Sequence, residues 1–155
     1  MKNKAYIVIP VLLLIFALAV LSAGCTTPVE PSGNPWTTSS EIVEKVEVYH
    51  FHRTQQCYSC KTLGAFAEET VNTYFAPEVA SGKVVFAHVN IDLPENKELV
   101  ERYGPTGSSL WIGVYDKDGF HKEENVNVWY KIGNKEEYLA YLKGVIEKRL
   151  AGDLS

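Results

Sequence analysis

The segment FHRTQQCYSCKTLGAF, residues 51–66, places two cysteines three positions apart, where a β-strand pattern gives way to a helical one. Such a Cys-x-x-Cys pair, here Cys57 and Cys60, can be a redox dithiol, a metal-binding pair or a structural disulfide. A disulfide across two intervening residues closes so small a loop that it restricts the unfolded chain very little. The spacing therefore argues against a purely structural disulfide and leaves redox chemistry and metal binding open.

The sequence on either side predicts where the cysteines lie. β-favouring residues alternate over 42–52 and predict a strand, and apolar residues at three- and four-residue steps predict a helix from Cys57 to about Phe75. At the first turn of this helix a thiolate would face unpaired backbone N–H groups and the positive end of the helix dipole, and both lower a thiol pKa. We therefore expect Cys57 to attack and Cys60, one turn further on, to resolve the mixed disulfide.

The rest of the chain continues the alternation of strands and helices. We expect strands at 83–92, 109–116 and 125–132, a short helix at 94–104 and a last helix at 134–150, with a turn at 117–119 joining the last two strands. This order predicts a right-handed βαβ unit followed by a hairpin and a covering helix. The fold class is thus a layered α/β sandwich, with its site at the carboxyl end of the first strand.

The first 25 residues have the order of an export signal. A charged start, an apolar run and small residues lead to Cys25, as in the lipobox of secreted lipoproteins, although Ser22 replaces the usual leucine. The same run could instead remain as an uncleaved membrane anchor. Residues 26–40 are rich in Pro, Thr and Ser and should form a tether, followed by one domain over 41–150 and a short tail at 151–155. Either reading places the domain on the extracytoplasmic face of the membrane.

The order of elements, with Cys-x-x-Cys opening the first helix, resembles the thioredoxin fold over roughly residues 43–150. FAHVNIDLPENKELVERYG is similar to the thioredoxin segment whose strand ends in NID and whose helix ends in YG. More narrowly, VYHFHRTQQCYSCKTL, with VNID and an exported N-terminus, resembles the nitrophenyl compound nitroreductase subunit, ArsF family. The resemblance implies a thioredoxin-like α/β/α sandwich with a mixed four-stranded sheet and a redox accessory role.

The resemblance also shows where this chain departs from thioredoxins. Gln56 stands where they have Trp, and Tyr58 and Ser59 replace the Gly-Pro between the cysteines. The family's buried acid, six residues before the first cysteine, corresponds to Phe51. The lysine beside that acid corresponds to His88, whose imidazole can accept a proton near neutral pH. His88 is therefore our candidate for the missing base, the alternative being a histidine satisfied by the backbone.

A second departure concerns the loop before the third strand. The thioredoxin cis-proline that faces the dithiol corresponds here to Ser109, and Pro105 is four residues too early to serve. The loop can still offer groups to a partner, so we expect Ser108 and Ser109, with Tyr58 and Ser59, to contact the substrate. In the family the cis-proline is thought to keep metals from the dithiol, so its absence favours metal binding.

Metal binding is the competing interpretation of the dithiol. His50 and His52 share a strand face leading to the cysteines, and Cys/His sets can hold Zn, Cu or a metalloid. Cys57, Cys60 and His52 would then be the ligands of a carrier module, whereas His50 should lie too far down the strand to reach the helix tip. A third possibility is a non-catalytic accessory subunit with an inert disulfide.

The composition of the chain limits the classes of binding partner that we expect. A formal net charge of −4 without a Lys- or Arg-rich run argues against nucleic acid. A dithiol carries two electrons itself, so the redox reading needs no other cofactor. We expect a monomeric domain whose partner is a protein thiol or disulfide, or a redox protein of the membrane. Arg53, in the loop before the cysteines, could stabilise a thiolate but is more typical of a solvated charge.

Overall fold

The computed structural model describes residues 43–155. The predicted signal or anchor at 1–25, its Cys25 and the tether at 26–40 lie outside the described residues. Between residues 43 and 155, no helix combines the length and hydropathy that crossing a bilayer requires.

Four strands form one mixed sheet in the order β2-β1-β3-β4. They are β1 (Lys45–His52), β2 (Val84–Asn90), β3 (Ser109–Asp116) and β4 (Gly119–Glu124). β1 is parallel to β2, as a βαβ unit requires, and β3 is antiparallel to both of its neighbours. The predicted thioredoxin-like α/β/α sandwich with a four-stranded mixed sheet is confirmed.

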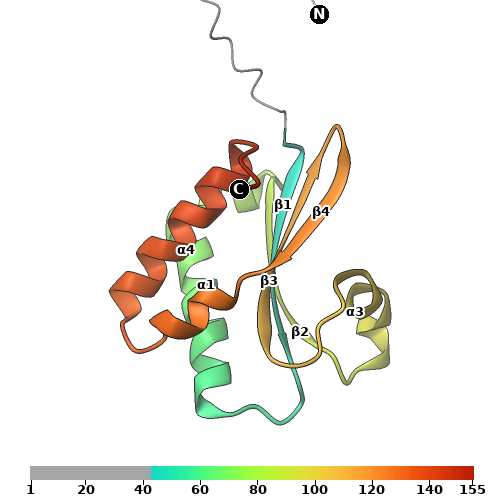
Figure 1. Cartoon of the computed structure of the whole chain (residues 1–155), viewed down its shortest axis with the longest axis vertical. Coiled ribbons are helices and arrows are strands. Elements are labelled where there is room, and N and C mark those ends of the chain that lie inside the picture. The colour runs from blue at the N-terminus through green and yellow to red at the C-terminus, as the bar shows by residue number, and fades with distance from the viewer. Residues whose placement is uncertain (1–42) are drawn as a thin grey trace, which may run out of the picture. The chain divides into compact units, whose positions relative to one another are not determined.

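Helices cover both faces of this sheet (Figure 1). α1 (Tyr58–Tyr74) and α4 (Lys135–Leu150) pack on one face, and α3 (Lys97–Tyr103) packs on the other. Short helices complete the chain: α2 (Ala76–Ala80) and the 3₁₀ segments η1 (Pro94–Asn96) and η2 (Val126–Lys131). The carboxyl ends of β1 and β2 and the start of β3 meet at one end of the sheet, where α1 begins.

Side-chain alternation along β1 divides the core in two. Val46 and Val48 join the larger cluster beneath α1 and α4, whereas Tyr49 and Phe51 join a smaller aromatic cluster around Tyr103 of α3. All four β1 residues are buried. β1 is the central element of the fold because it supplies both clusters.

The expected fourth strand at 125–132 is wrong. Asp116 Oδ1 accepts hydrogen bonds from the backbone N–H groups of Asp118 and Gly119, and Gly119 adopts φ +122°, so the turn ends there and β4 begins at once. The β-favouring residues that follow form η2, in which Val128 is fully buried and Tyr130 is 86% exposed. The turn position, rather than β propensity, determines which residues pair with β3.

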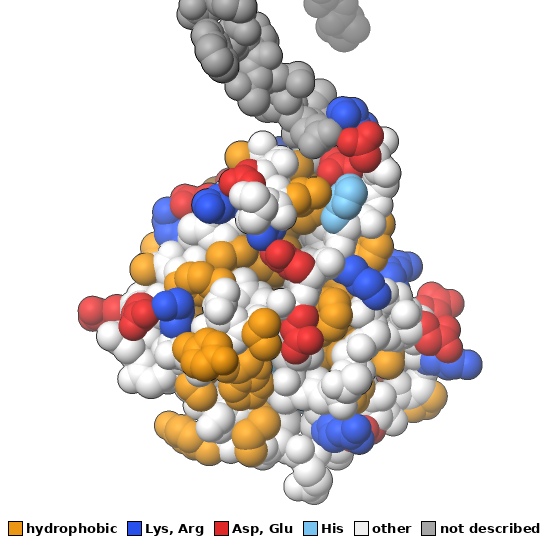
Figure 2. All heavy atoms as spheres, in the orientation of Figure 1, with side chains coloured by type: hydrophobic (Ala, Val, Ile, Leu, Met, Phe, Trp, Pro, Cys, Tyr) orange, Lys and Arg blue, Asp and Glu red, His pale blue; other side chains and the backbone are white. Residues whose placement is uncertain are grey.

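The surface visible in Figure 2 carries acidic and basic side chains interspersed, with apolar side chains gathered in its lower half. Val126 and Tyr130 of η2 are among the large apolar side chains that the structure leaves exposed. Another exposed large apolar side chain, that of Tyr58, lies beside the dithiol and is 86% exposed.

Candidate functional site

The helix that carries the dithiol begins with a cysteine as its cap. Cys57 is extended, with φ −71° and ψ 166°, and its Sγ accepts a hydrogen bond from the backbone N–H of Cys60 at 3.1 Å. A side-chain acceptor at this position normally comes from Ser, Thr, Asp or Asn. Here the sulfur itself takes the role, so the helix start and the reactive group are the same residue.

Cys57 and Cys60 are joined by a disulfide, with their Cα atoms 5.1 Å apart. Cys57 is exposed, whereas Cys60 is only partly accessible. A partner can therefore approach the first sulfur more easily than the second.

His50 reaches the dithiol helix at the backbone of Cys60, against the expectation that it would be too far down β1. Its side chain is buried, with the residue 1% exposed, and it forms a hydrogen bond with the Cys60 backbone. Ser108 Oγ lies 3.5 Å from His50 Nε2. Burial, followed by the nearby imidazoles of His88 and His52, lowers the pKa of His50 to about 3.

A glycine in α1 makes room for this imidazole. A Cβ on Gly64, one turn after Cys60, would overlap the His50 ring. Glycine is unfavourable inside a helix, so its use here is explained by close approach of the ring to the helix backbone. The pairing of Gly64 with a strand histidine was the signal that could have placed His50 at the site.

His88 lies on β2, the strand next to β1, and contacts His50. The two Nδ1 atoms are 2.9 Å apart, and His88 Nε2 lies 3.3 Å from Glu68 Oε2 on α1. The His88 side chain is 38% exposed, so it reaches solvent. The expected alternative, a histidine satisfied by the backbone, does not describe it, because both ring nitrogens have side-chain partners.

Phe51, the residue that corresponds to the family's buried acid, faces away from the dithiol helix. It packs with Tyr49 and Tyr103 on the α3 side of the sheet. Because neighbouring residues of a strand face opposite sides, the side chain toward α1 at this level is that of His50. The position that corresponds to the family's acid therefore lies on the opposite side of the sheet from α1.

The predicted substrate-contacting residues lie in different surroundings. Tyr58 is exposed, and Ser59 and Ser108 are partly exposed. Ser109 is 3% exposed, and its hydroxyl donates to Gly107 O and accepts from Trp111 Nε1. The Ser109 hydroxyl is thus engaged inside the protein.

Arg53 is held by other groups. Its guanidinium lies 3.3 Å from Asp92 Oδ1 and 3.5 Å from Thr106 O, and its side chain is 60% exposed. Asp92 also accepts from the Thr54 backbone N–H at 2.9 Å. These contacts tie the loop before the cysteines to the end of β2.

The proposed metal ligands do not form a binding group. Within residues 43–155, no set of three or more His, Cys, Asp or Glu residues is placed to hold a metal ion. Both sulfurs are engaged in the disulfide, and His52 Nδ1 donates to Arg53 O at 2.9 Å. His50, His52, Glu68 and His88 instead line a shallow cavity of about 360 Å³ beside the dithiol helix.

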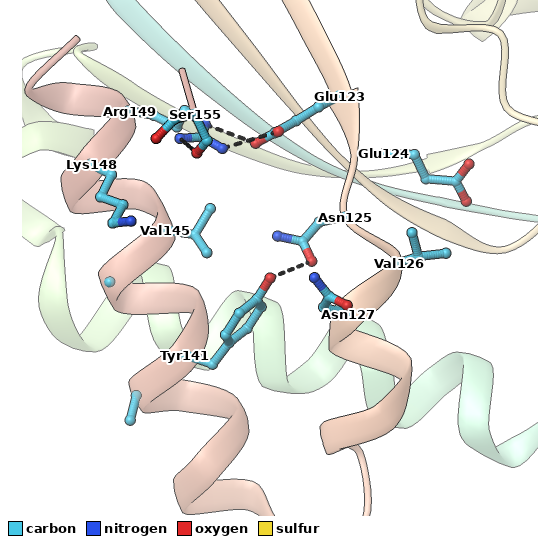
Figure 3. A pocket seen from close by; sticks show the side chains of 12 residues that line it. Glu123, Glu124, Asn125, Val126, Asn127, Tyr141, Val145, Lys148, Arg149 and Ser155 are labelled. Atoms are coloured by element: carbon cyan, nitrogen blue, oxygen red, sulfur yellow. Dashed lines mark hydrogen bonds and ion pairs between the residues drawn. The ribbon is translucent and has the colours of Figure 1, made fainter. Parts of the chain in front are cut away.

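A larger hollow of about 590 Å³ lies elsewhere, between the residues after β4 and α4. Figure 3 shows that its polar groups face one another: Tyr141 donates to Asn125 Oδ1 at 3.0 Å, and Arg149 binds Glu123 through Nε and Nη2 at 2.8 and 3.0 Å. Because these groups already satisfy each other, we interpret the hollow as a seam that attaches α4 to the sheet edge.

Comparison with known proteins gives a fold-level likeness only. No protein-family model matches the chain, and no curated protein is significantly similar to it. Among solved structures, the crystal structure of the Trx4 domain of ERdj5 matches with 15% identity and a TM-score of 0.45, over 68% of this chain and 82% of that domain. A likeness this distant carries no functional argument, so function must be inferred from the site itself.

Proposed function

We propose that the chain is a membrane-tethered, extracytoplasmic thiol–disulfide redox protein. Its dithiol, Cys57 and Cys60, would exchange two electrons with a disulfide or dithiol of a partner protein, or with a redox protein of the membrane. The observation that carries this proposal is the disulfide at the start of α1, with an exposed first sulfur that already accepts a helix N–H. The dithiol supplies the electrons, so the proposal needs no other cofactor.

The geometry supports a defined sequence of bonds. In the reduced protein, the Cys57 thiolate would keep its hydrogen bond from the Cys60 N–H and face the helix N-terminus, which favours the anion. It attacks one sulfur of a partner disulfide, and the other partner sulfur leaves as a thiolate. Cys60 then loses its proton and attacks Cys57 Sγ, which re-forms the internal disulfide and releases the second partner thiolate. The reverse order of the same steps reduces the domain.

Residues around the dithiol would position the partner. Tyr58, between the cysteines and highly exposed, offers an aromatic surface next to the sulfur under attack. Ser59 and Ser108 are partly exposed and offer hydroxyl groups, whereas Ser109 could contribute only through its backbone. We expect partner contacts to centre on Tyr58.

The cellular setting remains a proposal based on sequence. Export followed by lipidation at Cys25, or retention of residues 1–25 as an anchor, would hold the domain at the membrane surface in a compartment that permits disulfides. The resemblance to the ArsF family would then imply an accessory role in delivering electrons. The accessory role, unlike the membrane attachment, depends on the dithiol being active.

Replacing the resolving cysteine tests the proposal. In Cys60→Ser, Cys57 should accumulate mixed disulfides with added glutathione disulfide and with cellular proteins, detected by mass after thiol alkylation. In Cys57→Ser the same treatment should trap far fewer adducts, because the remaining thiol is less accessible. A Cys60→Ser protein that forms no adducts would contradict the proposal, and loss of a bound metal from both variants would favour a carrier.

A further inference from the structure

We propose that His50 and His88 form a two-imidazole proton relay that connects the buried side of the dithiol with Glu68 at the surface. The proposal rests on the redox function proposed above and adds the path by which the proton of Cys60 leaves. It assigns an inner role to His50, which sequence reasoning placed out of reach, and an outer role to His88.

The contacts along this path allow a single proton arrangement when both imidazoles are neutral. A carboxylate only accepts, so the Glu68 contact places a proton on His88 Nε2 and leaves His88 Nδ1 as an acceptor. His50 must then donate from its own Nδ1 across 2.9 Å. Its Nε2 carries the lone pair and faces Ser108 Oγ, which can donate over the longer 3.5 Å contact.

The inner histidine can pass a proton but cannot store one. With the residue 1% exposed, a charge on His50 would be poorly solvated, and its pKa of about 3 reflects this burial. His88 is better suited to hold the proton, because its side chain is 38% exposed and faces Glu68. A proton arriving at His50 Nε2 would therefore release the Nδ1 proton to His88.

The inner end of the relay lies at the resolving cysteine. In this arrangement Nδ1–H is the only donor of the His50 ring, so the hydrogen bond to the Cys60 backbone comes from the same N–H, and Gly64 lets the imidazole approach the next turn of the same helix. The two relay histidines thus lie on the adjacent strands β1 and β2, and Cys60 and Glu68 lie on α1, which packs against this face of the sheet. This placement gives the proton of Cys60 a route away from the exposed face where a partner would dock.

Other titratable groups surround the relay without joining it. His52 on β1 lowers the pKa of His50, but its own Nδ1 proton is given to Arg53 O. Lys61 and Glu68 line the same shallow cavity from α1. Only Glu68 contacts a relay nitrogen among the described charged groups, so it is the expected counter-ion.

Proton transfer from Cys60 accompanies closure of the internal disulfide. With Cys57 in a mixed disulfide, the Cys60 thiol gives its proton to His50 Nε2, and the Nδ1 proton of His50 moves to His88 Nδ1. The Cys60 thiolate bonds to Cys57 Sγ, and the Cys57–partner S–S bond breaks. The partner sulfur leaves as a thiolate with the electron pair, and the positive charge rests on His88 until solvent removes the proton.

An aromatic disulfide reagent allows the rate of attack by Cys60 to be measured separately from the rate of the first attack by Cys57. Reduced full chain in mild detergent, carrying Cys25→Ser so that Cys57 and Cys60 are its only thiols, is mixed with dithiobis(nitrobenzoate) in a stopped-flow instrument. The first coloured thiolate reports attack by Cys57, and the second reports attack by Cys60. The two rates are measured from pH 5 to pH 9 for each variant.

His88→Gln is the decisive variant, because a glutamine oxygen can still accept the His50 proton but cannot be protonated. We expect the second phase to slow about 100-fold, within the range for loss of a general base, with the first phase unchanged. Its pH midpoint should rise toward about 8.5, the value of an unassisted thiol, and added imidazole should restore the rate. His121→Gln, on the β4 hairpin beside Asp116, is the matched control and should leave both phases unchanged.

The outcomes separate the two proposals. A second phase in His88→Gln with the rate and pH profile of the parent protein would overturn the relay while leaving the redox function intact. A parent protein without a first phase would contradict the redox function itself. Glu68→Gln, an exposed substitution that should not disturb folding, must slow the second phase in the same direction as His88→Gln if the relay is correct.

Discussion

Strand β1 buries a carboxylate on one face of the sheet and an imidazole on the other, and their surroundings differ. Glu47, 4% exposed, faces α3, and His50, 1% exposed, faces α1. Glu47 accepts from Lys45 Nζ at 2.7 Å and from the hydroxyls of Tyr103 and Tyr115 at 2.7 and 3.2 Å. His50 instead pairs with a second imidazole that leads to solvent.

The difference shows when a buried titratable group is structural. Burial alone would raise the pKa of Glu47, but the hydrogen bonds from Lys45 and Tyr103 outweigh it and hold that pKa below its ordinary value. The carboxylate is therefore charged and fixed. His50 has a partner that can either accept or donate, so its protons can change places. A buried group whose surrounding donors keep their protons, such as Glu47, fixes the structure, and we call it a brace. A chain of groups whose protons can be exchanged, such as His50 and His88, provides a path for a proton.

Removing the brace should have the largest effect on stability. Glu47→Ala would leave the buried Tyr103 hydroxyl and the Lys45 ammonium without their acceptor, and we expect a loss of about 3 kcal/mol in the free energy of unfolding. Urea titration of the full chain measures this. Glu68→Ala, at an exposed carboxylate, should change stability by less than about 0.5 kcal/mol. Equal effects of the two substitutions would show that Glu47 is no brace.

On each side of the sheet a glycine makes room for the buried groups around His50 or Glu47. Replacing either glycine should have the next largest effect on stability. A Cβ on Gly64 would overlap His50, and one on Gly113 would overlap the Tyr103 hydroxyl. Alanine at either position should destabilise the protein by about 1–3 kcal/mol through overpacking. Gly144→Ala in α4 is the control, because nothing lies within 4 Å of its Cβ position, and it should stabilise by up to about 1 kcal/mol. Gly64→Ala with unchanged stability would contradict the close fit of His50.

The pH dependence of stability should distinguish the two faces, because their titratable groups lose their contributions over different pH ranges. His50 has a folded-state pKa of about 3 against an ordinary 6.5, so the unfolded chain binds its proton first as pH falls. Its contribution is complete above pH 6.5 and is lost toward pH 3, at about 1.4 kcal/mol per pH unit.

The Glu47 contribution is lost only below its ordinary pKa of 4.5, because its folded-state pKa is lowered. His50→Gln should therefore flatten the stability curve between pH 6.5 and pH 4.5, and Glu47→Gln should flatten it only below pH 4.5. Urea midpoints across this range measure both slopes. If the slope above pH 4.5 survives in His50→Gln, the imidazole is not held neutral by burial.

Sequence patterns were sufficient to predict the main elements of the fold and the position of the dithiol. Periodicity predicted β1 with its two faces and the helix that begins at Cys57, because both patterns reflect burial directly. They were insufficient for His50: alternation placed it on the face that leads to the cysteines, but its reach to the dithiol helix depends on the close approach that Gly64 allows. The burial of Ser109 likewise depends on the sheet, in which it pairs with Phe51 of β1.

The prediction of the fourth strand was wrong because it relied on β propensity alone. The stretch after Asn125 has high β propensity, but the turn at Asp116 and Gly119 had already determined which residues pair with β3. Propensity describes how well a residue suits a pleated, half-buried surface and does not determine which segment occupies it. Strand pairing therefore decided the error at β4, and helix–strand packing decided the error at His50.

The equilibrium reduction potential of the Cys57–Cys60 disulfide tests the central claim most directly. The full chain carrying Cys25→Ser would be equilibrated in glutathione and dithiothreitol buffers, with and without chelator, and its thiols counted by alkylation and mass. A redox function predicts a potential of roughly −270 to −120 mV that is independent of chelator. A disulfide that stays oxidised below about −300 mV, or thiols that alkylate only after chelation, would contradict it.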